Sequence, residues 1–432
     1  MNPAVADAVA DAHRREWAFV LAATVRVTRD LDLAEECVQD AYAKALATWD
    51  ERGIPASPGA WLTTVAKNRA LDLLRRDATM RRSLPLLLDE QTTPEPPEPD
   101  GSPVEDDRLR LIFTCCHPAL SEQAQVALTL RLLCGLTTAE VAHAFLVSET
   151  TMAARITRAK KKIATARIPY RVPPAEDLPA RIDAVLTVVH LLFTTGHTAP
   201  AGDTLVRHDL LDRSLDLVRM LRALLPGNGD VTGLLALIVL THARSAARVA
   251  GDGRMLLLAD QDRTRWDHAA IDEGVALVRE SLQSRPIGRY AIMAAIAALH
   301  AEAPSWEETD WHEVVCLYDL LLRVWPSPVV ALNRAVAVGF ADGFAYGLKE
   351  LDDLAADPRL AGYPYLPAAR ADFLHRLGRT AESRTAYEQA LTLTDNTLEK
   401  TFLTTRLNDL GPDQNHPPAN LRGRGPTRRN RD

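Results

Sequence analysis

Apolar residues recur at helical spacing along most of the chain, and the strict alternation that marks a β-strand is almost absent. In one early stretch the apolar residues are four, three and four positions apart and form a single stripe: Val38, Tyr42, Ala45 and Trp49. The polar residues of this stretch fall off the stripe: Glu36, Gln39, Asp40 and Lys44. The pattern predicts an all-α fold in which such stripes pack inward.

A second helix is predicted to begin after residue 57. Ser57 is a suitable N-cap and Pro58 suits the first helical position, so we expect a helix from Pro58 through Arg76. Its spacing places four residues on one side: Leu62, Val65, Arg69 and Leu73. Arg75 and Arg76 lie at its C-terminal end, where the helix dipole favours cations. From this pattern alone, two ordinary core helices with a solvated face are the favoured interpretation.

Residues 136–163 carry a more specific pattern. Thr137 followed by Glu140 predicts a capping box at the start of one helix. A short turn follows at residues 146–148, and Ser148 is the predicted N-cap of the next helix. Two helices joined by so short a turn are typical of a helix-turn-helix unit.

The second helix of this unit has two different faces. Four apolar residues are spaced to face inward: Met152, Ile156, Ala159 and Ile163. Polar and small residues are left facing outward: Glu149, Thr150, Ala154, Arg155, Arg158 and Lys161. A helix of this kind fits the DNA major groove, with Arg and Lys on base edges or phosphates. The alternative is a basic surface helix in a bundle.

Prolines and charges divide the chain into pieces. Residues 83–107 contain six prolines, eight Asp or Glu and no Lys or Arg, so they predict a linker. Further breaks at Pro169, Pro173 and Pro174 and at Gly411 leave three folded pieces, 1–82, 108–168 and 175–410, and a basic tail, 411–432.

The charge balance differs strongly between these pieces. Residues 108–171 hold 10 Lys and Arg against 3 Asp and Glu, although the whole chain has a net charge of -7. Residues 172–410 hold 23 against 32. A short basic module flanked by acidic sequence is the charge distribution of a nucleic-acid reader joined to a part with another role.

Two segments of the third piece predict a helical repeat. Their turn glycines, Gly343 and Gly378, are 35 residues apart, close to the period of 34 of a tetratricopeptide repeat. Gly378 is followed by residues suited to close helix packing: Ser383, Tyr387 and Ala390. Stacked helix pairs offer a concave surface to a peptide, protein or ligand.

Composition excludes several classes of protein. With 47% hydrophobic, 25% charged and 5% aromatic residues the chain is globular, and it has neither a signal-peptide pattern nor a run of 18 apolar residues. We therefore expect a cytoplasmic protein that is not bound to a membrane. Five scattered cysteines fit a reducing compartment.

No pattern of enzyme or cofactor chemistry stands out in the sequence. The adjacent residues Cys115, Cys116 and His117 lack zinc-site spacing and are predicted to be packing residues. We expect no metal, no cofactor and no enzymatic activity. A dense charged cluster predicts a buried salt-bridge network between helices: Asp262, Arg263, Arg265 and Asp267.

The order of these motifs resembles a known family. VQDAYAKALATW, PGAWLTTVAKNRALDLLRR, an acidic linker and the helix-turn-helix are similar to regions 2 and 4 of a bacterial RNA polymerase sigma factor of the extracytoplasmic-function type. FTCCHPAL, DQDRTRWD, AAIAALHAEAP and SPVVALNRAVAV resemble the subgroup with a C-terminal tetratricopeptide-like domain. One departure is Thr194-Thr195-Gly196-His197, where that subgroup usually has Asn-Glu-Gly-Tyr.

The resemblance implies partners and site residues. It implies that core RNA polymerase contacts the protein through its β′ clamp helices and β flap, the clamp helices binding Glu36, Gln39, Asp40 and Lys44. It implies that the -10 promoter element meets the loop 50–59 and the helix after it: Trp61, Asn68, Arg69, Arg75 and Arg76. It implies that the -35 element meets the helix-turn-helix: Glu149, Thr150, Thr151, Arg155, Arg158 and Lys161.

Melting a promoter needs a site that favours single strands, by pocketing an exposed base and holding phosphates. Trp61 could stack on a base, although burial of this tryptophan is the favoured interpretation. The C-terminal piece is then a built-in regulator with its own protein or ligand partner. Two alternatives stay open: a polymerase-independent helix-turn-helix regulator with a helical-repeat sensor, and a repeat scaffold whose basic module is incidental.

Overall fold

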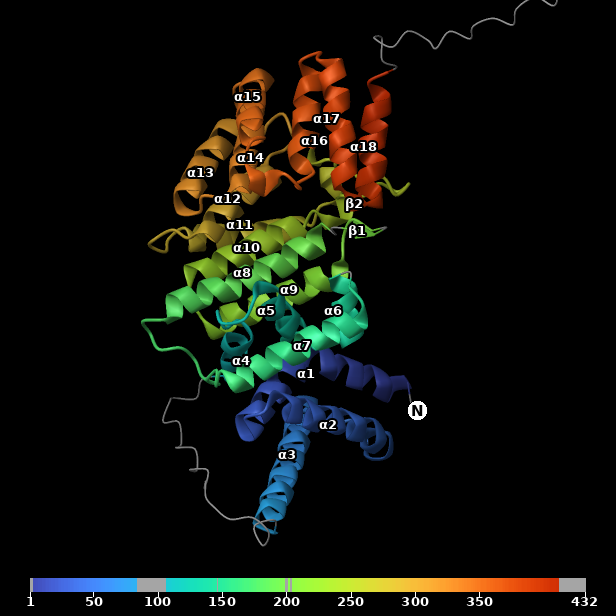
Figure 1. Cartoon of the computed structure of the whole chain (residues 1–432), viewed down its shortest axis with the longest axis vertical. Helices are drawn as coiled ribbons and strands as arrows, with labels where there is room; N and C mark the ends of the chain where they lie inside the picture. The colour runs from blue at the N-terminus through green and yellow to red at the C-terminus, as the bar shows by residue number, and fades with distance from the viewer. Residues whose placement is uncertain (1–2, 84–105, 146, 199–200, 203, 412–432) are drawn as a thin grey trace, which may run out of the picture. The chain divides into compact units, whose positions relative to one another are not determined.

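The protein, as a computed structural model, is built of helices, as the spacing predicts (Figure 1). The structure describes residues 3–83, 106–145, 147–198, 201–202 and 204–411. Within these ranges, paired strands are limited to the parallel pair β1 (Ala201–Gly202) and β2 (Asp395–Asn396) and an isolated bridge. Most of the predicted linker and most of the predicted tail lie outside the described residues, although Ser83 ends α3 and Asp107 begins α4.

Contacts within the chain divide it into two compact units that alternate along the sequence, and α12 (Arg289–Glu302) contributes residues to both. Unit 1 comprises residues 1–198, 206–245 and 267–298, and unit 2 comprises residues 199–205, 246–266 and 299–432. The other helices of unit 1 are α1 (Pro3–Thr28), α2 (Leu31–Arg52), α3 (Pro58–Ser83), α4 (Asp107–Cys115), α5 (Glu122–Leu128), the π-helix Thr129–Leu133, α6 (Thr138–Ala144), α7 (Glu149–Thr165), α8 (Leu178–His197), α9 (His208–Leu224), α10 (Gly229–His242) and α11 (His268–Ser281).

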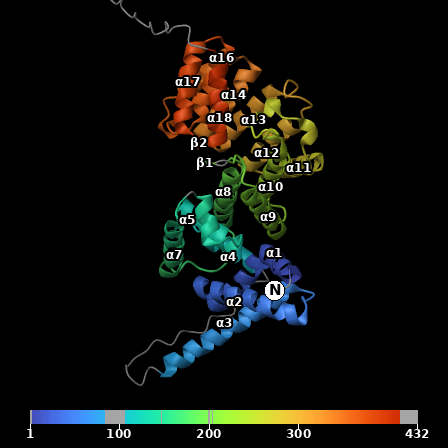
Figure 2. The same cartoon turned by 90° about the vertical axis from the view of Figure 1, so that its right-hand side faces the viewer.

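The first three helices form a bundle. Asp30 caps α2 by accepting hydrogen bonds from the backbone N–H groups of Asp32 and Leu33. The helix α1 packs against both α2 and α3, and Figure 2 shows α3 extending past the ends of the other two. The α3 helix begins at Pro58, as predicted, but continues to Ser83 rather than ending at Arg76.

Helix α9 packs on α8 and α10, and α11 packs on α10, whereas α6 and α7 pack on each other. By length and composition α8 could cross a membrane. Its apolar face, however, packs against α9 and α10, which is the position of a core helix: Ile182, Val185, Leu186, Val188, Val189, Leu192 and Phe193. The helix α10 is buried along almost its whole length and packs closely on α11.

Unit 2 contains successive packed helix pairs. Its helices are α13 (Trp311–Val324), α14 (Pro328–Ala341), α15 (Phe344–Leu354), α16 (Tyr365–Arg376), α17 (Thr380–Leu393) and α18 (Thr397–Asp409). Gly343 lies between α14 and α15 with φ 119°, and Gly378 lies between α16 and α17 with φ 74°. Both predicted turn glycines therefore adopt the left-handed conformation that glycine tolerates best.

Candidate nucleic-acid interface

The face of α2 opposite its buried stripe is open to solvent. The four stripe residues are at most 7% exposed, as predicted: Val38, Tyr42, Ala45 and Trp49. The four predicted partner-binding residues are all exposed: Glu36, Gln39, Asp40 and Lys44. The helix α2 therefore has one face that packs in the bundle and an opposite polar face that a second molecule can reach.

The helix α3 turns a different face inward from the one its spacing suggested. Its fully buried residues are Leu62, Ala66 and Ala70, whereas Val65, Arg69 and Leu73 are half-buried. Alanines at these positions allow α1 and α2 to pack closely against α3. The buried side therefore lies one position after Val65 and Arg69, at Ala66 and Ala70.

Of the residues predicted for the -10 element, Asn68, Arg75 and Arg76 are exposed. Trp61 is half-buried, with its ring edge against Trp49 at a centroid distance of 5.5 Å. The favoured expectation that Trp61 is buried is therefore only partly met, and part of its surface remains accessible.

The structure joins two of the predicted sites. The Arg69 Nε donates to Asp40 Oδ2 at 2.8 Å, so a side chain assigned to DNA pairs with one assigned to polymerase. Both side chains are more than a third exposed, 36% and 48%, so the ion pair contributes little to stability. It nevertheless places the two predicted surfaces side by side.

The helix-turn-helix caps form as predicted. The backbone N–H of Thr137 donates to Glu140 Oε2 at 2.6 Å, and the N–H of Glu140 donates to Thr137 Oγ1 at 3.2 Å. Ser148 Oγ accepts from the backbone N–H of Thr151 at 3.2 Å at the start of α7. Residue 146 of the predicted turn lies outside the described residues.

The two faces of α7 also divide as predicted. The inward residues are at most 7% exposed: Met152, Ile156, Ala159 and Ile163. Arg158 is exposed, whereas Arg155 is half-buried, with its guanidinium carbon 5.6 Å from the centroid of the Phe145 ring. The other predicted DNA-facing residues are exposed: Glu149, Thr150, Thr151 and Lys161.

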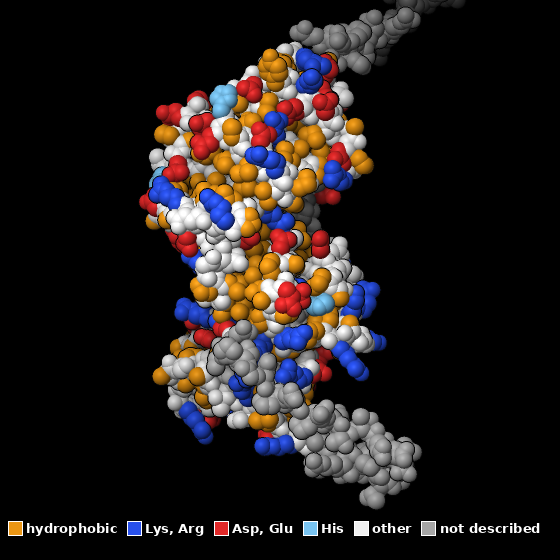
Figure 3. Space-filling model, turned by 90° about the vertical axis from the view of Figure 1, so that its left-hand side faces the viewer, with side chains coloured by type: hydrophobic (Ala, Val, Ile, Leu, Met, Phe, Trp, Pro, Cys, Tyr) orange, Lys and Arg blue, Asp and Glu red, His pale blue; other side chains and the backbone are white. Residues whose placement is uncertain are grey.

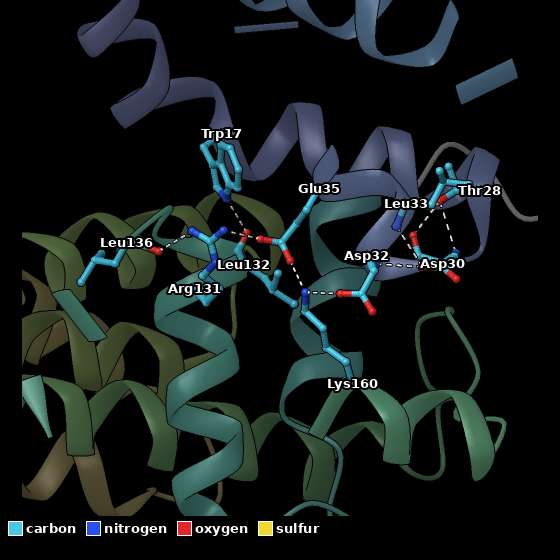
Figure 4. Close-up of polar contacts among 10 residues, drawn as sticks. All are labelled: Trp17, Thr28, Asp30, Asp32, Leu33, Glu35, Arg131, Leu132, Leu136 and Lys160. Atoms are coloured by element: carbon cyan, nitrogen blue, oxygen red, sulfur yellow. Dashed lines mark hydrogen bonds and ion pairs between the residues drawn. The ribbon is translucent and has the colours of Figure 1, made fainter. Parts of the chain in front are cut away.

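No role was predicted for Lys160, which reaches the first helical bundle (Figure 4). Its Nζ contacts Asp32 Oδ1 at 2.6 Å and forms a closer ion pair with Glu35 Oε2. The two carboxylates raise the pKa of Lys160 above its usual value, despite a desolvation that acts in the opposite direction. The lysine therefore stays charged although its side chain is only 11% exposed.

A second cation completes this contact. Arg131 Nη2 lies 2.9 Å from Glu35 Oε1, and its Nη1 donates to the carbonyl oxygen of Leu136. Glu35, only 5% exposed, is thus held between two cations from outside the first bundle. Burial of such a carboxylate is tolerated because each of its two oxygens lies at ion-pair distance from a cation.

Apolar packing surrounds these charges. The indole N–H of Trp17, a buried residue of α1, donates to the carbonyl oxygen of Leu132 at 3.1 Å (Figure 4). Gly135, with φ 70°, lies beside it, and an added Cβ would be 3.0 Å from atoms of both His13 and Trp17. The two predicted DNA-reading modules are therefore docked on one another through a closely fitted interface. The local sequence pattern contained no signal for it.

The cysteines of the FTCCHPAL motif are packing residues. Cys115 and Cys116 are at most 1% exposed, and Cys116 Sγ lies 3.6 Å from Thr129 Oγ1. Burial raises the pKa of the Cys116 thiol to about 12, which keeps it protonated. Among the described residues, no group of three or more His, Cys, Asp or Glu has a geometry that could hold a metal ion.

The predicted salt-bridge network at residues 262–267 is wrong. Arg263 Nη1 donates to the carbonyl oxygens of His300 and Ala303 at 2.9 and 2.7 Å, and Arg265 Nη2 donates to that of Ala246. Asp262 and Asp267 instead cap the starts of helical turns. Arginine has five donors, so helix C-terminal carbonyls compete effectively with carboxylates for it.

Comparison with known families agrees with this arrangement. Sigma-70 region 2 matches residues 13–79, Sigma-70, region 4 matches residues 110–163, and a family of unknown function, DUF6596, matches residues 181–282. The first falls on α1–α3, the second on α4–α7 and the third on α8–α11. An uncharacterized protein of Rhizobium meliloti (strain 1021) is 42% identical over 397 residues, which cover 91% of this chain and 93% of that protein.

Two promoter-recognition regions on an all-α scaffold define the class of the protein: it is a sigma-70-like factor. More particularly, the chain belongs to the same family as the Rhizobium meliloti protein, since their similarity extends over nearly the full length of both. We refer to α1–α3 as region 2 and to α4–α7 as region 4 below.

Proposed function

We propose that the protein is a transcription initiation factor of the extracytoplasmic-function type, which binds core RNA polymerase in the cytoplasm and directs it to promoters. In this proposal region 2 contacts polymerase and the -10 element, and region 4 contacts the -35 element. The observation that carries the proposal is the division of α2 and α7 into a buried stripe and an exposed face that holds the residues assigned to partners.

Polymerase binding is assigned to the exposed face of α2, through Glu36, Gln39, Asp40 and Lys44. A helix bearing both signs of charge suits a partner helix with complementary charges. Because Asp40 also pairs with Arg69, a change at Asp40 alters both proposed surfaces at once. Gln39 has an exposed side chain and is the cleaner position for testing polymerase binding alone.

Promoter binding is assigned to α3 and α7. Arg75 and Arg76 lie in the last third of α3, and Asn68 and Trp61 lie earlier in the helix. These residues would hold the -10 strand as it melts, by electrostatic attraction and stacking. On α7, the exposed Arg158 suits a phosphate. Arg155, whose rotation is restricted by the Phe145 ring, suits a base edge.

The helices from α8 onward are proposed to modulate this activity. The acidic balance of residues 172–410, 23 Lys and Arg against 32 Asp and Glu, allows this part to compete with DNA for the basic region 4. The tetratricopeptide-like character of unit 2 belongs to the same proposal, supported by the packed helix pairs α14–α15 and α16–α17 and their turn glycines.

The test is run-off transcription with core polymerase, combined with a polymerase-binding assay. Gln39→Ala and Asp40→Ala should weaken the complex with polymerase. Arg155→Ala should leave that complex intact and weaken recognition of the upstream element by roughly 1–3 kcal/mol if it makes a bidentate base contact. Arg14→Ala, on an exposed side chain of α1, is the matched control and should behave as wild type.

A protein that forms no complex with core polymerase, yet binds a defined duplex in a salt-dependent manner, would contradict the proposal. It would favour the second candidate, a polymerase-independent helix-turn-helix regulator with a helical-repeat sensor. The capped helix-turn-helix supports both candidates, whereas the match to Sigma-70 region 2 favours the first.

A further inference from the structure

Unit 2 contains a small hollow between α13 and α14 that the proposed function does not use. Its volume is about 170 Å³. That is roughly the space of five or six water molecules, and less than a typical drug-sized site. The residues lining it are Leu258, His300, Trp306, Trp311, Val314, Tyr318, Asn333, Val336 and Ala337.

Four of the nine residues that line the hollow are aromatic, and four others are aliphatic. The ring centroids of Trp306 and Trp311 are 4.7 Å apart with an interplanar angle of 66°, so the two indoles meet edge to face. The His300 ring lies parallel to Trp306 and edge-on to Trp311, at 6.4 and 5.4 Å. Behind them, Phe340 stacks on Trp311 at 4.7 Å and fixes its orientation.

Three of the motifs singled out in the sequence converge on this place. Arg263 of DQDRTRWD donates to the carbonyl oxygens of His300 and Ala303 and so fixes the end of AAIAALHAEAP. Asn333, from SPVVALNRAVAV, lies on the α14 side of the hollow with Val336 and Ala337. These motifs are thereby accounted for as the frame of one site.

Two polar groups on the lining remain available to a ligand. In the described part of the chain, neither the Tyr318 hydroxyl nor the Asn333 amide makes a hydrogen bond. Burial raises the pKa of Tyr318 to about 12, so its hydroxyl is a neutral donor or acceptor at physiological pH. A pocket lined by aliphatic and aromatic side chains with a few polar groups is the usual form of a small-ligand site.

The chain segment around the hollow is rich in negative charge. Residues 299–322 contain no Lys or Arg and six acidic residues: Glu302, Glu307, Glu308, Asp310, Glu313 and Asp319. Asp319 is neutralised by Arg334 at 2.6 Å, and the Arg263 guanidinium stacks 4.5 Å from the Trp266 ring. The other acids of this segment are exposed. The upper half of the face drawn in Figure 3 shows acidic and basic side chains among hydrophobic ones.

We propose that this aromatic hollow binds the cationic head of an alkylammonium ligand, with Trp306 and Trp311 as the principal contacts. Indole rings attract organic cations through their electron-rich faces, and quaternary ammonium groups are recognised in aromatic cages. A trimethylammonium head, which consists of one nitrogen and three methyl groups, is small enough for this volume. The acidic surroundings attract such a cation and disfavour an anion.

The same chemistry can come from a free small molecule or from a methylated lysine of a protein. The test is calorimetric titration of the full chain with choline, with its neutral carbon isostere 3,3-dimethyl-1-butanol, and with a short trimethyl-lysine peptide. We expect saturable choline binding and binding of the isostere weaker by about fivefold. Tighter binding of the peptide would identify the source as a protein side chain, and equal binding would identify a free ammonium compound.

The variant Glu307→Gln/Glu308→Gln should weaken choline binding about threefold, because it removes two exposed negative charges beside Trp306. Glu388→Gln, at an exposed acid on α17, is the matched control and should bind as wild type. Trp306→Leu should abolish binding, and the glutamine variant keeps the proposal testable if that change unfolds unit 2.

The proposal is overturned if neither choline nor the peptide binds saturably, or if the neutral isostere binds as tightly as choline. It is also overturned if a folded Trp306→Leu protein retains wild-type binding. None of these measurements involves polymerase or DNA. A negative result in these binding measurements would therefore not contradict the proposed role in transcription. Likewise, a negative transcription result would not contradict ligand binding by the hollow.

Discussion

Glu35 shows how much one side chain can contribute to the docking of distant segments. It lies on α2, yet both of its ion-pair partners, Arg131 and Lys160, belong to region 4. Truncating Glu35 would leave Arg131 and Lys160 largely buried without this carboxylate as their counter-charge. The loss of folding stability should therefore be larger than if all three charged groups were replaced together.

We therefore expect Glu35→Ala to lower the free energy of unfolding by about 3 kcal/mol, measured by urea denaturation of the full chain. The control is Asp11→Ala, whose carboxylate forms exposed ion pairs with Arg14 and Arg15 on α1. That change should cost no more than about 0.5 kcal/mol. Equal effects of the two substitutions would show that the Glu35 contact is not buried in solution.

His190 makes the stability of unit 1 sensitive to acid. Burial, with a smaller contribution from the charge of Arg289, lowers the pKa of His190 to about 4. Below its usual pKa of about 6.5 the unfolded chain binds a proton that the folded chain refuses, so stability falls as the pH drops from 6.5 to 4. The loss contributed by this residue is of the order of 3 kcal/mol.

The measurement is the urea midpoint across that pH range. His190→Phe, which keeps an aromatic ring beside Tyr290 and Phe193, should flatten the profile, whereas the exposed-site change His268→Asn should retain it. A profile that is just as steep in His190→Phe would assign the acid sensitivity to other groups.

The start of the helix α7 is stabilised by its N-cap residue, Ser148. Ser148 Oγ accepts the backbone N–H of Thr151 and also contacts the hydroxyl groups of Thr150 and Thr151. These side chains begin the helix that we propose reads DNA, so their cap also orders the end nearest the bases.

Ser148→Ala should destabilise α7 by about 1 kcal/mol, because one helix N–H loses its partner. Ser148→Asp should retain most of the stability, since aspartate is an equally good cap and suits the positive end of the helix dipole. Thermal unfolding followed by circular dichroism distinguishes the two. An aspartate variant as unstable as the alanine one would show that the cap does not act through this hydrogen bond.

The sequence predicted the features of single helices more successfully than the packing of one helix against another. The caps at Thr137 and Ser148 and the stripe from Val38 to Trp49 depend on residues a few positions apart, so local spacing was sufficient to find them. The buried face of α3 was displaced because Ala66 and Ala70, weak hydrophobic signals in the sequence, allow close helix packing. What selects them is the neighbouring helices, which periodicity does not contain.

For the molecule as a whole, the sequence indicated the order of modules but not their contacts. Lys160 was assigned to neither face of α7, and its partners Asp32 and Glu35 lie more than 120 residues away. Likewise, the arginines at 263 and 265 were expected to pair with acids nearby and instead bind carbonyl oxygens from other segments. Long-range pairs leave no periodic trace in a single sequence.

A double-mutant cycle tests the contact between regions 2 and 4. Glu35→Gln and Lys160→Gln should show a coupling energy of roughly 1–3 kcal/mol in urea unfolding, since the two charges are in direct contact. The control cycle pairs Glu35→Gln with Lys162→Gln, at an exposed lysine two positions along α7. That pair should be additive within about 0.5 kcal/mol, and equal couplings would contradict a specific contact.

The ion pair between Lys160 and Glu35 also limits how far apart α7 and α3 can lie. Five residues further along α2, Asp40 forms an ion pair with Arg69 of α3. While both ion pairs are intact, the backbones of α7 and α3 at these residues can therefore be at most roughly 30 Å apart, even with extended side chains. Promoter positions -35 and -10 are 25 base pairs apart by name, about 85 Å of duplex at 3.4 Å per pair. If the two regions read these positions as proposed, the ion pair between Lys160 and Glu35 must be broken in the bound protein. The strength of that pair is then a threshold that polymerase and promoter together must exceed.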